Sequence, residues 1–189
     1  MSQKTPVFLH GKKVDLRPVL KSDLPFLVCW INDPDVRNFL STYLPQTEGA
    51  EEEWLSQMSK RDEHNITLVI ALKDGTPIGM MGIHKINWRD RVATTGSFIG
   101  EKENWGKGYG TDAKMALLGY CFNTINIRKV CSEAIEFKGR SIAYSKKCGY
   151  EEEGRRKEHI FRNGRYWDLV QLAVFREGFE EAWSKYQEK

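Results

Sequence analysis

The stretch Trp105-Gly106-Lys107-Gly108-Tyr109-Gly110-Thr111 carries the strongest signal in this chain. It lies between a predicted strand and a predicted helix, and its three glycines stand at alternate positions. Glycine lets the backbone turn with unusual dihedral angles and approach a ligand closely. The N–H groups of such a loop and of the helical turn after it form a positive, concave site that suits phosphate or pyrophosphate. The same spacing also fits a tight strand-to-helix turn that binds nothing.

Two known phosphate-binding motifs are excluded. The chain contains no G-x-x-x-x-G-K-[ST] string, so the loop is not a P-loop. Gly106 and Gly108 begin a G-x-G pattern, but Thr111 stands where a dinucleotide-binding fingerprint needs its third glycine. The loop is therefore of another type.

Short strands alternate with helical segments on both sides of the loop. Strands are predicted over residues 14–19, 66–72, 77–86, 91–99, 128–135, 150–161 and 166–175. Helices are predicted over residues 24–31, 48–60, 111–122, 140–148 and 178–186, with Ser22 or Asp23 as the cap of the first. Asp74-Gly75 and Asn163-Gly164 are dipeptides that favour two-residue hairpin turns. The pattern indicates an α+β fold with one mixed sheet.

The composition is that of an ordinary globular chain. It has 189 residues, of which 40% are hydrophobic, and this length is typical of a single domain. Lys and Arg number 29 against 26 Asp and Glu, a formal net charge of +3, which does not fit a polybasic nucleic-acid-binding protein. Apolar runs such as 66–72 are too short to span a membrane, and no signal-peptide pattern opens the chain.

Four cysteines, Cys29, Cys121, Cys131 and Cys148, form no C-x-x-C pair and have no histidine at ligand spacing. A zinc site is therefore not expected. Three of the four lie in apolar segments, which favours buried and reduced thiols. We expect a cytoplasmic protein that needs no metal and has no membrane-spanning segment. We also expect no direct contact with nucleic acid.

Gly106-Lys107-Gly108-Tyr109-Gly110 resembles the G-x-G-x-G/A core of the GNAT superfamily of acetyl-CoA-dependent N-acetyltransferases. Trp105 before it is similar to the subgroup of ribosomal-protein N-terminal acetyltransferases and their relatives that modify small molecules. Further segments resemble that subgroup: Leu16-Arg17-Pro18, Asp23-Leu24, Trp30-x-Asn32-Asp33-Pro34-x-Val36, Ser141-Ile142, Lys147-Cys148-Gly149-Tyr150, 154–159, Asn163-Gly164 and Asp168. Two positions differ, because Lys138 and Ser145 stand where relatives commonly carry an Asn and a Tyr.

The resemblance implies a single GNAT-like domain over residues 1–189, with a core of about residues 14–183. Its sheet would be mixed and mostly antiparallel, flanked by helices, with a splay between two central strands, at residues 98–100 and 132–135. The resemblance also implies acetyl-CoA as co-substrate without a metal, and it is compatible with a homodimer.

The same resemblance assigns the residues that would hold acetyl-CoA. Phe98, Ile99 and Gly100 would lie beside the pantetheine arm, and a backbone N–H freed by the splay would polarise the thioester carbonyl. Lys147 is assigned to the same cofactor. The pyrophosphate would be held by the backbone N–H groups of Trp105, Gly106, Lys107, Gly108, Tyr109, Gly110 and Thr111, with added charge from the Lys107 side chain.

The amine that receives the acetyl group must lose a proton. At pH 7 a lysine-like amine, with a pKa near 10.4, is neutral in about 0.04% of molecules, whereas an α-amine is neutral in about 10–20%. A general base therefore matters more for a polyamine than for a protein N-terminus. Glu133 is the first candidate, because it lies in a strand opposite the expected acetyl site. Glu101, Glu103 or an ordered water are alternatives, and a solvated surface position would account for each of these glutamates.

The departing thiolate needs a proton or a hydrogen bond. Ser141 and Tyr144 are candidates, since both lie on the predicted helix beside the expected sulfur position, and Ser145 is a third. Ser141 also fits the N-terminal cap of that helix, and Tyr144 fits a core aromatic whose hydroxyl reaches water.

We expect an N-acetyltransferase that acts on a primary amine. The subgroup resemblance favours the α-amine of a protein N-terminus. The alternatives are a small-molecule amine, such as a polyamine, amino sugar or aminoglycoside, and a catalytically silent module that only binds acyl-CoA. A polyamine site needs several carboxylates, whereas a peptide site needs an open groove.

Overall fold

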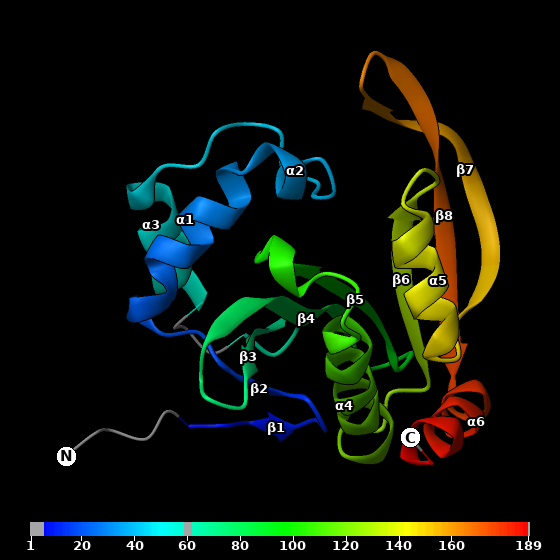
Figure 1. Ribbon diagram of the computed structural model, residues 1–189. Coiled ribbons are helices and arrows are strands. Elements are labelled where there is room, and N and C mark those ends of the chain that lie inside the picture. The colour runs from blue at the N-terminus through cyan, green and yellow to red at the C-terminus, as the bar shows by residue number, and fades with distance from the viewer. Residues whose placement is uncertain (1–5, 59–61, 189) are drawn as a thin grey trace.

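An eight-stranded mixed sheet organises the chain (Figure 1). The computed structural model describes residues 6–58 and 62–188. The strands lie in the order β1-β2-β3-β4-β5-β6-β8-β7. Their bounds are β1 Leu9–His10, β2 Val14–Pro18, β3 Ile66–Leu72, β4 Pro77–Asn87, β5 Val92–Ile99, β6 Lys129–Ile135, β7 Glu151–Arg162 and β8 Arg165–Phe175.

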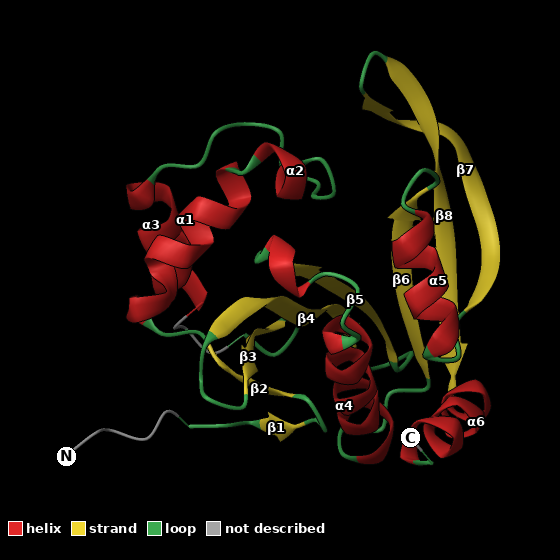
Figure 2. Cartoon of the chain, in the orientation of Figure 1, coloured by secondary structure: helices red, strands yellow, loops and turns green. Residues whose placement is uncertain are grey.

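Helices pack on both faces of the sheet (Figure 2). They are α1 Leu24–Asn32, α2 Pro34–Arg37, α3 Glu48–Met58, α4 Tyr109–Asn123, α5 Gly139–Lys147 and α6 Arg176–Gln187, with short 3-10 turns at Lys21–Asp23 and Lys102–Asn104. Strand β3 shows how the faces divide, because successive side chains of a strand point to opposite sides. Leu68 and Ile70 join the core that α4 and α6 cover, whereas Val69 and Ala71 join the core under α1 and α2.

The central strands β5 and β6 run parallel and separate partway along. They pair from Val92 opposite Lys129 to Thr94 opposite Cys131, although β5 continues to Ile99 and β6 to Ile135. The other strand pairs are antiparallel. The predicted mixed sheet with a central splay is therefore confirmed.

Both hairpins form where the turn dipeptides predict them. Gly75 has a φ of +93° and Leu72 N donates to Thr76 O at 2.8 Å. Asn163 and Gly164 have φ values of +52° and +78°, the left-handed pair that a type I′ turn requires. These turns fix the pairing of β3 with β4 and of β7 with β8.

Asp23 takes the predicted N-cap position of α1, but its side chain makes no cap hydrogen bond, and the alternative reading of Ser141 as the cap of α5 is wrong. The Asp23 carboxylate does not cap α1; it accepts two hydrogen bonds from the buried Arg17 guanidinium, at 2.7 and 2.8 Å. The bidentate Arg17 guanidinium occupies both carboxylate oxygens of Asp23, so they are not available to the N–H groups of the helix. Lys138 occupies the N-cap position of α5 without a side-chain cap hydrogen bond, so Ser141 lies inside the helix.

Other boundaries shift by a few residues. Helix α4 begins at Tyr109 and not at Thr111, because Gly108 takes the left-handed conformation, with a φ of +84°, directly before it. The described part of α3 ends at Met58, and the predicted residues 59 and 60 lie outside the described residues. Strand β1 and helix α2 were not predicted. In the described part of the chain, no helix is long and apolar enough to cross a membrane.

Candidate active site

A deep cleft of about 1600 Å³ opens at the splay between β5 and β6. Its walls come from α1–α3 on one side and from α5 and the β7–β8 hairpin on the other, with β4 and β5 between them. Figure 1 shows these two parts facing one another across the ends of β5 and β6. Pockets for one small ligand commonly measure about 300–1,000 Å³, so this cleft has room for two reactants side by side.

The glycine loop forms one rim of the cleft. Gly106 and Gly108 both have positive φ, +79° and +84°, which L side chains rarely adopt. A Cβ added at Gly106 or Gly110 would meet no atom within 4 Å, so the space above these backbone positions is open to a ligand. The first N–H groups of α4 have no acceptor inside the helix and carry its positive end. The loop is therefore built to receive an anion.

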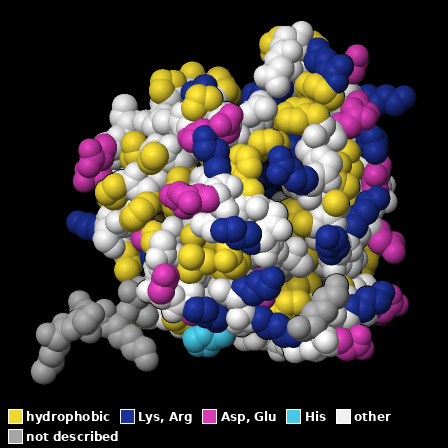
Figure 3. Space-filling view, viewed as in Figure 1, with side chains coloured by type: hydrophobic (Ala, Val, Ile, Leu, Met, Phe, Trp, Pro, Cys, Tyr) yellow, Lys and Arg dark blue, Asp and Glu magenta, His cyan; other side chains and the backbone are white. Residues whose placement is uncertain are grey.

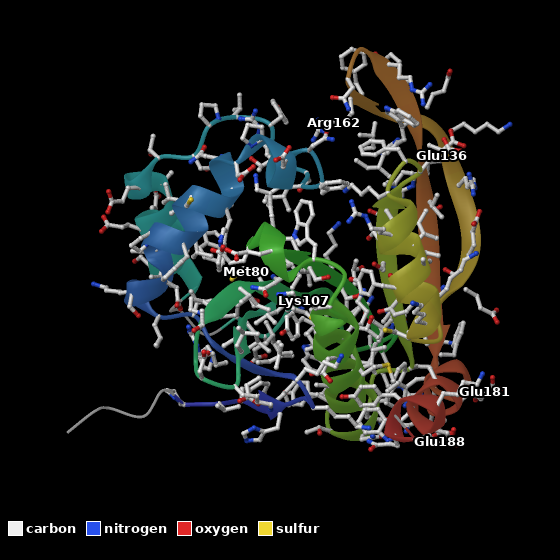
Figure 4. All side chains as sticks on the ribbon, in the orientation of Figure 1. Met80, Lys107, Glu136, Arg162, Glu181 and Glu188 are labelled. Atoms are coloured by element: carbon white, nitrogen blue, oxygen red, sulfur yellow. The ribbon has the colours of Figure 1, made fainter. Side chains whose placement is uncertain are left out.

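Lys13 adds a cation to this loop, and no motif in the sequence predicts it. The buried Asp112 carboxylate, on α4, accepts hydrogen bonds from the N–H groups of Lys12, Lys13 and Val14 at 2.9–3.0 Å. Lys13 Nζ in turn donates to Lys107 O at 3.2 Å. Figure 4 shows Lys107 at the head of α4. The Lys13 ammonium thus lies beside the backbone of Gly108, whereas Lys107 Nζ lies 3.4 Å from Asn104 Oδ1.

The end of β5 is held in place by two tryptophans. Trp105 Nε1 donates to Ile99 O at 2.8 Å, and the Trp30 ring packs so tightly on Gly100 that an added Cβ would lie 2.2 Å from it. Trp30 Nε1 also donates to Glu101 at 2.7 Å. Phe98 and Ile99 line the cleft, whereas Gly100, Glu101 and the Lys107 side chain do not. Glu103 also lies outside the cleft lining, so neither alternative glutamate reaches the site.

Tyr144 spans the splay from α5 to β5. Its hydroxyl lies 2.5 Å from Ser97 Oγ, and its ring lies 4.7 Å from the ammonium of Lys114, a side chain that is only 1% exposed. Ser141 and Lys147 also line the cleft. Ser145 does not line it and is buried beneath the helix. Of the three candidate acids, Ser141 and Tyr144 therefore face the cleft.

Glu133 and His84 are two of the cleft residues that can accept a proton. Glu133 lies on β6 with a side chain that is 40% exposed, 3.6 Å from the Arg156 guanidinium. His84 lies on β4 and was not predicted as a site residue; its ring fits beside Gly82 and Gly96. Burial is the main cause that lowers the pKa of His84, which favours the neutral imidazole at neutral pH. A lone histidine in a strand gives no sequence signal of such a position.

Two cations reach across the cleft and bridge its two walls. Lys138 Nζ donates to Phe39 O, and the Arg162 guanidinium donates to Leu40 O at 3.0 Å and Ser41 O at 3.4 Å. Burial, followed by the charge of Arg162, lowers the pKa of Lys138 to about 8. Lys138 thus forms a cross-cleft contact at the position where relatives commonly carry an Asn.

Comparisons with known proteins agree with this geometry. Residues 13–151 match the model of the acetyltransferase (GNAT) domain family. A putative ribosomal N-acetyltransferase of Bacillus subtilis, YdaF, is 31% identical over 58% of this chain and 59% of its own length. The spermidine N(1)-acetyltransferase of Vibrio cholerae is 25% identical over 87% of this chain and 94% of its own length.

A crystal structure of spermidine N-acetyltransferase from Vibrio cholerae, in complex with CoA and spermine, superposes with a TM-score of 0.83. It is 22% identical to this chain and covers 90% of it and 99% of its own length, so it supports the fold. In the described residues, no group of three or more His, Cys, Asp or Glu side chains could hold a metal ion. The chain therefore belongs to the GNAT acetyltransferase domain family and is an N-acetyltransferase that uses acetyl-CoA.

Proposed function

We propose that this enzyme acetylates a primary amine of a small molecule. The observation that carries the proposal is the bridge across the cleft, where Lys138 and Arg162 donate hydrogen bonds to the backbone of residues 39–41. An extended peptide would need a groove that no such bridge crosses. The similarity to spermidine acetyltransferases along most of the chain supports the same conclusion. The expectation of a protein N-terminus, which came from the subgroup resemblance, takes second place.

The chain's own residues suggest how each reactant is held. The N–H groups of residues 106–111, with Lys13 and Lys107, would bind the pyrophosphate of acetyl-CoA, and the open space above Gly106 and Gly110 fits that group. Phe98 and Ile99 would border the pantetheine arm, with Lys147 near the phosphates. When bound, acetyl-CoA supplies an acetyl group activated as a thioester.

Proton transfer would fall to side chains on opposite walls. Glu133 or the neutral His84 would take the proton of the acceptor amine, directly or through water. Tyr144, fixed by its hydrogen bond with Ser97, would give a proton to the departing thiolate, with Ser141 as the alternative donor. The nitrogen–carbon bond forms as the carbon–sulfur bond breaks. The proton lost by the amine and the proton gained by the thiolate are therefore both transferred within one cleft.

An acceptor screen tests the proposal. The protein and acetyl-CoA are incubated with spermidine, amino sugars, aminoglycosides and short peptides, and products are read by a mass increase of one acetyl group. We expect acetylation of small amines and little of peptides. Acetylation of peptide N-termini alone would overturn the proposal and favour the second candidate, which the partial similarity to YdaF supports. A cytoplasmic location remains part of the proposal.

A further inference from the structure

A second recess opens beside the cleft, and three arginines from different elements line it. Its volume is about 620 Å³. Arg37 comes from α2, Arg140 from α5 and Arg162 from β7, and Trp105 forms part of the wall. Figure 4 shows Arg162 directed toward the segment around α2. Elements that are far apart in the sequence thus bring three guanidinium groups to one place.

In the described part of the chain, these guanidinium groups have no carboxylate partners. Within residues 6–58 and 62–188, none of the three forms an ion pair. The hydrogen bonds of Arg162 go to carbonyl oxygens, and Arg140 lies over the Trp105 ring at 5.7 Å. The carboxylate in the recess, Asp35, is paired with Lys102 at 2.8 Å.

Guanidinium groups without a carboxylate partner suit an oxyanion ligand. The planar fork of an arginine matches two oxygens of a carboxylate or phosphate, and charged hydrogen bonds of this kind are about twice as strong as neutral ones. Lys138, beside Arg162, adds a further positive charge. Figure 3 shows Lys and Arg side chains along the face that carries α4 and α5. A polycation would be repelled from such a recess.

The recess and the cleft are continuous. Asn38, Phe39, Trp105, Arg140 and Arg162 line both of them. A molecule with its amine in the cleft can therefore place another group in the recess without leaving the protein surface.

The carboxylates of the cleft also argue against a polycationic acceptor. Within the described chain three line it: Glu51, Asp62 and Glu133. Asp62 accepts hydrogen bonds from His64 and Asn65, Glu133 lies near Arg156, and burial raises the pKa of Glu51. The described residues of the cleft therefore leave no group of free carboxylates to bind several ammonium groups.

We propose that the recess of Arg37, Arg140 and Arg162 binds the carboxylate or phosphate of an acceptor that carries both a primary amine and an anionic group. This inference rests on the proposed function and narrows its acceptor class. It separates this chain from an enzyme built for free polyamines.

The test compares amines with and without an anionic group. Glucosamine and glucosamine 6-phosphate test for phosphate, hexylamine and 6-aminohexanoate test for carboxylate, and spermidine is the polycation. Release of free CoA gives kcat/KM for each. We expect the anionic member of at least one pair to exceed its neutral partner by about tenfold or more, as for one added charged hydrogen bond, and spermidine to fall below hexylamine.

Variants then connect this preference to the recess. Arg37→Gln and Arg162→Gln should bring the ratio within the preferred pair toward one. Lys157→Gln removes one positive charge from the exposed part of β7, outside both cavities, and should keep the wild-type ratio. Calorimetry with acetyl-CoA is run on each variant. If the arginine variants weaken acetyl-CoA binding and leave the ratio unchanged, the recess serves the coenzyme and the inference is wrong.

Failure of the inference differs from failure of the proposed function. If neutral amines or spermidine are acetylated as well as the anionic amines, the enzyme acts on small amines but the recess does not select them. If acetyl-CoA binds but no amine reacts, glucosamine 6-phosphate and 6-aminohexanoate are titrated into the CoA-saturated protein. Heats equal to those of the neutral partners would then overturn the inference. Absence of acetyl-CoA binding would remove the proposed function and the inference with it.

Discussion

Replacing Lys138 by Met should change how the stability of the fold depends on pH. Burial is the main reason that the pKa of Lys138 falls from the ordinary lysine value of 10.5 to about 8, and the charge of Arg162 adds to it. The unfolded chain keeps this proton up to about pH 10.5, whereas the folded chain loses it near pH 8. Between these two values the unfolded state binds more protons, so the free energy of unfolding rises with pH. Below pH 7 both states are protonated and the cost of the buried charge is constant.

The size of this effect follows from proton linkage. From pH 7 to pH 9.5, a folded-state pKa of about 8 gives the wild type a gain of about 2 kcal/mol in unfolding free energy. The Lys138→Met variant lacks the titrating group and does not gain it. The difference between the two proteins should therefore shift by about 2 kcal/mol over this range in favour of the wild type.

Urea unfolding at several pH values, followed by fluorescence, measures this difference. Lys146→Met on the exposed side of the same helix is the matched control, and its difference from the wild type should stay flat across this range. A flat difference for Lys138→Met as well would show that the Lys138 ammonium is solvated, and that it does not bridge the cleft walls as described.

Three further predictions concern the loop, the end of β5 and the proton donor. Asp112→Asn should lower the unfolding free energy by about 3 kcal/mol or more, because the carboxylate accepts several charged hydrogen bonds; a urea midpoint near the wild type would contradict this. Gly100→Ala should cost about 1–3 kcal/mol in the same assay, because its Cβ would meet the Trp30 ring, whereas Gly139→Ala, with open space, should cost little. Tyr144→Phe should lower kcat by about tenfold or more with little change in acetyl-CoA affinity; unchanged kinetics across pH would show that Tyr144 is not the acid.

Local signals in the sequence predicted the hairpins and the strand-to-helix loop. Gly75, Asn163 and Gly164 take the left-handed backbone that these turns need, and both hairpins form. The sites built from distant segments could not be predicted in this way. Lys13 reaches Lys107 because Asp112 binds the N–H groups of residues 12–14, and no pattern along the chain encodes that contact.

The positive charge of the arginine recess could not be predicted from the sequence for a related reason. Arg37, Arg140 and Arg162 look like ordinary surface residues in the sequence, and only the fold brings them to one recess. Balanced composition concealed this local excess of positive charge, since a net charge of +3 averages over the whole chain. His84 was likewise invisible, because its position depends on two neighbouring glycines across the sheet.

The hydrogen bonds of Asp112 also bear on how truncations and tags would affect this protein. Its carboxylate joins residues 12–14 to Tyr186, whose hydroxyl donates to it at 2.5 Å, so both outlying segments are fastened at the head of α4. Truncations that remove either segment, or tags that displace it, would loosen the cradle for the coenzyme phosphates. Such edits would register as weaker acetyl-CoA binding, even though neither segment contains the glycine motif.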